Sequence, residues 1–210
     1  MTEGAKLSAA AQEIENWKAP NAAEIYAAQR MDAIGRAAMA VSDFRLAAKM
    51  FDELTKLAPT RENYASLGEA LGRFGKYDEA KQAFEAALRV DPRYMGAWFN
   101  MAVMFDLAFK HEEAEVAYAK SIEIEETPAA RNNLANQQRA LLKLDEAEKN
   151  YRRAVEIGYP GAQMNLSLLL MMKGDYVQGL PMFEMREEFG SEAAYGPARE
   201  MLRILRNTSA

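Results

Sequence analysis

The residue best suited to act as a base or a metal ligand is the single histidine, His111. Glu112 and Glu113 follow it, but a zinc-binding helix needs a second histidine four positions on, and the chain has none. Gly75-Lys76 lacks the upstream glycine of a phosphate-binding loop. Cysteine is absent, which excludes thiol nucleophiles and thiolate metal sites. We therefore expect a protein that is not an enzyme and needs no metal or cofactor.

Charge and hydropathy narrow the classes of partner. The 210 residues carry 26 Lys and Arg against 31 Asp and Glu, a net charge of −5. A general nucleic-acid binder usually has a basic surface, so we expect no nucleic-acid partner. Neither a secretory signal nor an apolar run of about 20 residues is present, so we expect no membrane span. These features predict a cytoplasmic protein, with a periplasmic location left open if a leader has been removed.

The elements that must position any site are helices. The chain is rich in alanine and other good helix formers, and it has only 12 Gly and 7 Pro. A pattern of small and aromatic residues also recurs along it. Its clearest copy lies between residues 61 and 93 and consists of Tyr64, Leu67, Gly68, Leu71, Tyr77, Ala80, Phe84, Ala87 and Pro92. The units start at residues 28, 61, 95, 128 and 160, a period of about 33 residues.

Each unit has the residues that two packed helices need. Small residues such as Gly35 and Gly68 let two helix backbones approach, and large residues such as Phe51 and Phe84 fill the space beside them. One helix pair cannot bury its apolar face alone, so neighbouring pairs must stack.

This pattern resembles the tetratricopeptide repeat (TPR). The resemblance implies an all-α fold, a right-handed α-solenoid of about five TPR helix pairs with N- and C-terminal capping helices. We divide the chain into a lead-in helix (1–27), five repeats (28–189) and a C-terminal capping helix (190–210). The fifth repeat is similar to the closing repeats of many bacterial arrays, which indicates a bacterial origin. The repeats span 28–60, 61–94, 95–127, 128–159 and 160–189.

The first and the last repeat of the array each depart from the others. The first helix of the array has no breaker between residues 21 and 41, so we expect it to be longer than its equivalents. Pro181 lies inside the fifth repeat, and it fits a helix only if that helix begins near Gln178 or Gly179.

The resemblance also places a partner-binding groove on the first helix of each pair. The sixth position of each unit, which faces this groove in the family, is Asn in three successive repeats: Asn100, Asn133 and Asn165. Side-chain amides in such a row can bond the backbone of an extended peptide. The same register assigns a larger set of residues to the groove: Asp32, Arg36, Glu69, Arg73, Phe99, Val103, Asp106, Asn132, Asn136, Arg139 and Leu168.

Some alternatives stay open. The asparagine row is either used for binding or inherited as a common family residue. Phe99 either lines the groove or is partly buried against the next repeat. TPR co-chaperones that hold the C-terminal carboxylate of heat-shock chaperones use a set of Lys, Asn and Arg residues, and the basic members are missing here in every register. That subclass is therefore disfavoured.

The sequence thus predicts a non-catalytic scaffold or adaptor that binds an extended segment of a protein or peptide partner in its groove. The alternative is a self-associating scaffold, a homo-oligomer, or the regulatory part of a larger enzyme assembly.

Overall fold

The computed structural model describes residues 21–184, and their side chains as far as residue 181. Residues 1–20 of the predicted lead-in (1–27) and the capping helix at 190–210 lie outside these residues, whereas residues 22–27 of the lead-in form the beginning of α2. The described part contains ten α-helices and no strand. They are α2 (Ala22–Ala40), α3 (Phe44–Leu57), α4 (Arg61–Arg73), α5 (Tyr77–Val90), α6 (Met95–Leu107), α7 (His111–Ile124), α8 (Pro128–Ala140), α9 (Leu144–Glu156), α10 (Pro160–Met172) and α11 (Tyr176–Glu184).

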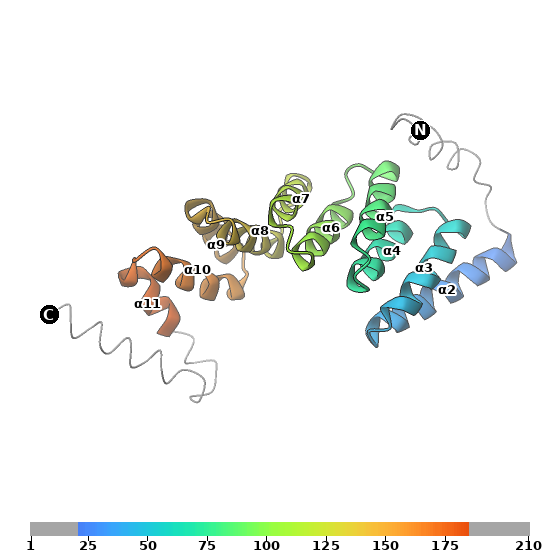
Figure 1. Ribbon diagram of the computed structural model, residues 1–210, viewed down its shortest axis with the longest axis horizontal. Helices are drawn as coiled ribbons and strands as arrows, with labels where there is room; N and C mark the ends of the chain where they lie inside the picture. The colour runs from blue at the N-terminus through green and yellow to red at the C-terminus, as the bar shows by residue number, and fades with distance from the viewer. Residues whose placement is uncertain (1–20, 185–210) are drawn as a thin grey trace. The chain divides into compact units, whose positions relative to one another are not determined.

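The helices pair in chain order and form two compact units (Figure 1). The first unit contains the hairpins α2–α3, α4–α5 and α6–α7, and the second contains α8–α9 and α10–α11. The boundary lies between residues 124 and 125. In the first unit α4 packs against α3 and α6, and in the second α10 packs against α9 and touches α8. The first helix of each pair is called an inner helix below.

Local signals set where several helices begin. Asn21 forms a capping box with Glu24, and Asp43 accepts a hydrogen bond from the backbone N–H of Leu46 at 3.0 Å. Proline occupies the first turn of α8 and α10, where its missing N–H is harmless. α2 has 19 residues, whereas the other inner helices have 13. The expected longer first helix is therefore confirmed.

The expectation for Pro181 was wrong. α11 begins at Tyr176, and Pro181 lies inside it. The start is set by Asp175, whose carboxylate accepts hydrogen bonds from the backbone and side-chain nitrogens of Gln178 at 3.1 and 2.7 Å. This cap and the packing of α11 against α10 both support the helix, in which Pro181 cannot donate a backbone hydrogen bond.

The core is made by aromatic residues of the second helices against small residues of the inner helices. Phe51 is 2% exposed, and Phe84, Tyr118 and Tyr151 are fully buried. A Cβ atom added to Gly68 would lie 2.8–2.9 Å from three atoms of the Phe84 ring, and one added to Gly35 would be as close to Phe51. The backbone of the inner helix therefore touches the ring face, which is the packing that the repeat pattern predicts.

Three turns within helix pairs place a residue other than glycine in the left-handed region. Phe109 has φ 57° and Leu142 has φ 59°, while glycine occupies the equivalent position in two other turns, Gly75 and Gly174. Both Phe109 and Leu142 are largely exposed, at 82% and 76%. A bulky side chain in this conformation costs roughly 1–2 kcal/mol, so these two turns are strained.

Candidate functional site

In the first unit, five of the predicted groove residues, Glu69 among them, line one pocket of about 120 Å³ between α4 and α6. Phe99, Asn100 and Val103 come from α6, and Arg73 comes from the end of α4. The three α6 residues are half-buried, so each offers part of its side chain to the pocket. Glu69 also comes from α4, and the lining residues that the sequence did not assign to the groove are Gly72, Met104 and Leu107.

Phe99 lines the pocket and also packs inside its own helix pair, a contact different from the burial against the next repeat that the sequence left open. Its ring stands edge-on to the ring of Tyr118 on α7, with the centroids 5.6 Å apart and the planes at 72°. Tyr118 belongs to the same helix pair and is fully buried. Phe99 is thus held by the core through one edge while another part of its surface lines the pocket. A ring held in this way gives the pocket a rigid apolar wall.

Asn100 has an unused amide. Its side chain makes no hydrogen bond to any other residue of the described part of the chain, although it is only partly exposed. A half-buried amide without a protein partner retains two donors and one acceptor for a ligand or water. Asn100 therefore places a polar group beside the apolar surface that Phe99 and Val103 form.

The two arginines predicted for the first unit are neutralised on their own helices. Arg36 donates from Nε to both carboxylate oxygens of Asp32 at 2.9 Å, and Arg73 lies 3.4 Å from Glu69. Arg36 does not line the pocket. Exposed pairs of this kind contribute little to stability. Their effect on the inner helices is to cancel charge, so the pocket of the first unit is close to neutral.

In the second unit the predicted asparagines bond to one another. Asn165 on α10 donates from Nδ2 to Oδ1 of Asn132 on α8 at 2.8 Å, and Asn132 donates to Oδ1 of Asn133 at 3.2 Å. Asn132 was expected to line the groove but is only 4% exposed, because it is the buried link between the other two amides. Asn132 and Asn165 are 33 residues apart, which is one repeat, so a search for polar pairs one period apart would have found this contact.

Asn136 and Arg139, two further residues predicted for the groove, lie beside the core tyrosine Tyr151. The hydroxyl of Tyr151 donates to Oδ1 of Asn136 at 2.6 Å. Burial raises the pKa of this hydroxyl, and a hydrogen bond from Arg139 acts in the opposite direction. The three side chains therefore form one cluster at the end of α8.

Glu126, just before α8, is a structural residue that sequence reasoning missed. Its carboxylate accepts hydrogen bonds from Nε of Arg131 at 2.8 Å and from Nε and Nη2 of Arg153 at 3.0 and 2.7 Å. The hydrogen bonds from Arg153 and, to a smaller extent, from Arg131 lower the pKa of Glu126 from 4.5 to about 2. The carboxylate thus joins α8 to α9 outside the core.

This shift predicts a pH-dependent stability. Because the pKa of Glu126 is lower in the folded chain than its ordinary value of 4.5, its contribution is fully present above about pH 4.5 and is lost as the pH falls toward 2. We expect Glu126→Gln to melt at a lower temperature than the wild type at pH 7. The gap should close between pH 4.5 and 2, as followed by circular dichroism.

The matched control is Glu113→Gln, since Glu113 forms no ion pair with the other residues described. Its melting temperature should follow that of the wild type at every pH. A gap for Glu126→Gln that stays constant down to pH 2 would contradict a role for the ionised carboxylate.

His111 begins α7, and its ring stands edge-on to that of Phe109, with the centroids 6.5 Å apart. Among the side chains described, no three His, Asp or Glu residues gather closely enough to hold a metal ion. None of the helices between residues 21 and 184 is both long and apolar enough to cross a membrane.

Stacked helix hairpins whose inner helices touch the aromatic rings of their partners define a helical repeat protein, an α-solenoid. The tetratricopeptide repeat family matches residues 65–131. These residues are tetratricopeptide repeats, and the predicted all-α solenoid fold is confirmed.

Curated relatives come from fungi and an archaeon. The heat-shock protein cognate co-chaperone sgt12 of Aspergillus fumigatus is 30% identical over 125 residues, 59% of this chain and 36% of that protein. The small glutamine-rich tetratricopeptide repeat-containing protein 2 of Saccharomyces cerevisiae is 34% identical over 92 residues, 43% of this chain and 27% of that protein. The chain thus spans about a third of the length of these two relatives. An uncharacterised protein of Methanocaldococcus jannaschii is 30% identical over 64 residues, 30% of this chain and 74% of that protein.

Solved bacterial structures share the fold. The pilF protein of Pseudomonas aeruginosa superposes with a TM-score of 0.70 at 15% identity, over 82% of this chain and 80% of that one. MamA of Desulfovibrio magneticus superposes with a TM-score of 0.68 at 16% identity, over 77% of this chain and 94% of that one. At these identities the likeness concerns the fold, and the bacterial origin of this chain stays a prediction.

Proposed function

We propose that this protein is a scaffold whose inner helices bind an extended segment of a partner protein. The observation that carries the proposal is the unpaired amide of Asn100 in the pocket that Phe99 and Val103 line. An extended peptide needs both features, because its backbone presents N–H and C=O groups while its side chains need an apolar surface. The pocket volume of about 120 Å³ suits one apolar side chain, since an engineered cavity of roughly 150 Å³ holds benzene.

The relatives support a protein partner, because sgt12 is by name a heat-shock cognate co-chaperone. The residues of this chain point to a different mode of recognition from the carboxylate-binding co-chaperones. In one of the three registers, Phe99 and Val103 occupy the positions where those proteins carry Lys and Asn, and the other two registers lack the basic residues as well. The first unit thus offers an apolar contact in place of a cationic one.

The asparagines are assigned different roles in the two units. In the first unit Asn100 bonds the peptide backbone directly. In the second unit Asn132 holds Asn165 and Asn133 in one orientation through hydrogen bonds of 2.8 and 3.2 Å. Amides that are already oriented lose little entropy when a ligand binds, so they are suited to the same task.

The test is selection of a random-peptide library on the full-length wild type and on two variants. One variant carries Asn100→Ala, and the other carries Asn133→Ala with Asn165→Ala. We expect peptides to be enriched on the wild type, and their affinity to fall by about fivefold or more for each variant, since a hydrogen bond contributes about 1 kcal/mol. Fluorescence anisotropy with the selected synthetic peptides measures the change.

Gln82→Ala is the matched control, because Gln82 is an exposed amide on α5, the second helix of its pair. It should leave peptide affinity unchanged, and all variants should keep the circular dichroism spectrum of the wild type. Enrichment that survives in both asparagine variants would exclude the amides as the site. A library that yields no binder would contradict peptide binding, and light scattering would then test self-association.

A further inference from the structure

The inner helices of the second unit differ in charge from the rest of this acidic protein. Neither α8 nor α10 contains an aspartate or a glutamate, whereas α8 contains two arginines. One of them, Arg131, is neutralised by Glu126 at 2.8 Å and donates from Nη1 to Asn150 at 2.8 Å. The other, Arg139, is left as the only cation of these two helices without a carboxylate.

Arg139 is also incompletely paired. Its Nε is buried and makes no hydrogen bond within the part of the chain that the structure describes. The carboxylates of the neighbouring helix α9 are engaged elsewhere or lie out of ion-pair range. Asp145 and Glu148 bind Lys173 at 2.6 and 2.7 Å, and Glu156 binds Arg153 at 2.9 Å. A partly enclosed guanidinium without a counter-ion is unfavourable, so Arg139 favours an anionic partner, which would bind at its terminal nitrogens because Nε itself is buried.

The groups around Arg139 determine which kind of ligand group can bind there. The hydroxyl of Tyr151 accepts from Arg139 and donates to Oδ1 of Asn136. Because one lone pair of its oxygen is used in this way, Asn136 has two N–H donors and a single acceptor site left to offer. The guanidinium of Arg139 is a donor without acceptors. The cluster therefore presents more donors than acceptors and carries a positive charge, a set that is complementary to a carboxylate.

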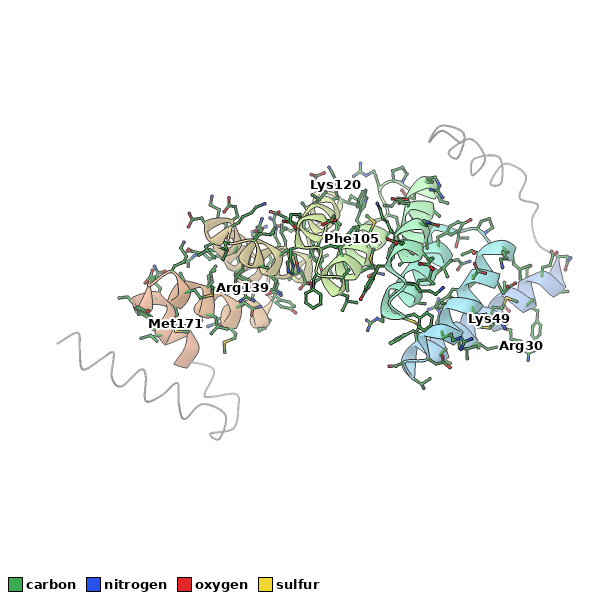
Figure 2. The ribbon with its side chains drawn as sticks, viewed as in Figure 1. Arg30, Lys49, Phe105, Lys120, Arg139 and Met171 are labelled. Atoms are coloured by element: carbon green, nitrogen blue, oxygen red, sulfur yellow. The ribbon has the colours of Figure 1, made fainter. Side chains whose placement is uncertain are left out.

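We propose that Arg139 and Asn136 bind the carboxylate of an acidic side chain in the partner segment. This inference rests on the proposed function, and it names the class of partner: an extended segment with an acidic residue beside the backbone that the asparagines hold. Arg139 is labelled in Figure 2. It lies six residues after Asn133, about 9 Å further along α8. An acidic side chain can leave the peptide backbone and extend along α8 toward Arg139, whereas a C-terminal carboxylate stays in line with the backbone.

The experiment uses a random-peptide library whose peptides are fused at their C-termini, so every carboxylate that is selected belongs to a side chain. The full-length wild type should enrich peptides with Glu or Asp at one fixed position. A synthetic, C-terminally amidated peptide of that sequence is compared with its Glu→Gln version on the wild type and on Arg139→Gln. On the wild type, the Glu→Gln peptide should bind about ten- to hundredfold more weakly than the acidic peptide, since hydrogen bonds to charged groups contribute about 1.5–3 kcal/mol. On Arg139→Gln the two peptides should bind alike.

Two further variants separate recognition from folding. Arg139→Lys keeps the charge but loses the planar fork, so it should retain part of the preference for the acidic peptide. Arg152→Gln removes an arginine from α9 of the same unit and should bind like the wild type. The proposal would be overturned if the Glu→Gln change in the peptide lowered its affinity equally for the wild type and for Arg139→Gln. Selected peptides without an acidic position would overturn it too, and in that case the proposed peptide binding would still stand. A library without any binder would overturn both.

Discussion

Phe84→Ala is expected to lower the free energy of unfolding by about 3–5 kcal/mol, the usual cost of removing a fully buried aromatic side chain. Phe84 is completely buried, and its ring lies against the backbone of α4 at Gly68. The substitution removes the ring on which that helix rests. Urea denaturation followed by circular dichroism measures the change. Phe74→Ala is the control. Because Phe74 is 43% exposed, its substitution should lower the free energy of unfolding far less.

A second substitution tests whether the contact with Gly68 is specific. A Cβ atom at residue 68 would lie 2.8–2.9 Å from the Phe84 ring, so Gly68→Ala should destabilise the wild type. In a Phe84→Leu background the ring is gone, and alanine should then be favoured over glycine by up to about 1 kcal/mol because of its higher helix propensity. Gly68→Ala with the same sign in both backgrounds would show that the ring is not what requires glycine.

Asn150→Leu is expected to lower the free energy of unfolding by about 2–3 kcal/mol, since it removes hydrogen bonds from buried or charged groups without a large change in volume. Asn150 is 9% exposed. It accepts from Arg131 at 2.8 Å, and it donates to Oε1 of Gln138 at 2.8 Å and to the carbonyl oxygen of Glu146 at 3.2 Å. Leucine can satisfy none of these partners.

Urea denaturation again gives the measurement, and Lys149→Leu is the control. Lys149 is the exposed neighbour of Asn150 on α9, so its substitution should change the free energy of unfolding by no more than about 0.5 kcal/mol. If Asn150→Leu proved as stable as the control, the polar contacts between α8 and α9 would not contribute to the stability of the second unit.

The repeat explains why the fold was predictable. Gly68 and Phe84 recur with equivalents at a fixed spacing, and each such contact forms within one helix pair. Starts and ends of helices follow from capping residues close in the chain, such as Asn21 and Asp43. Pro181 was misjudged because a rule based on the proline alone includes neither the Asp175 cap nor the packing of α11 against α10.

The sequence by itself determined that this protein is all-α and repetitive, and which aromatic and small residues pack together. Those properties depend on contacts within a pair or between adjacent pairs. Only the tertiary structure decided how the polar side chains are used. Asn132 is a buried link and Asn100 an unpaired amide, although both were assigned to the same groove. Hydrogen bonds and ion pairs form or fail with changes of a few tenths of an ångström in the distance between side chains from different helices. A repeat pattern does not contain those distances.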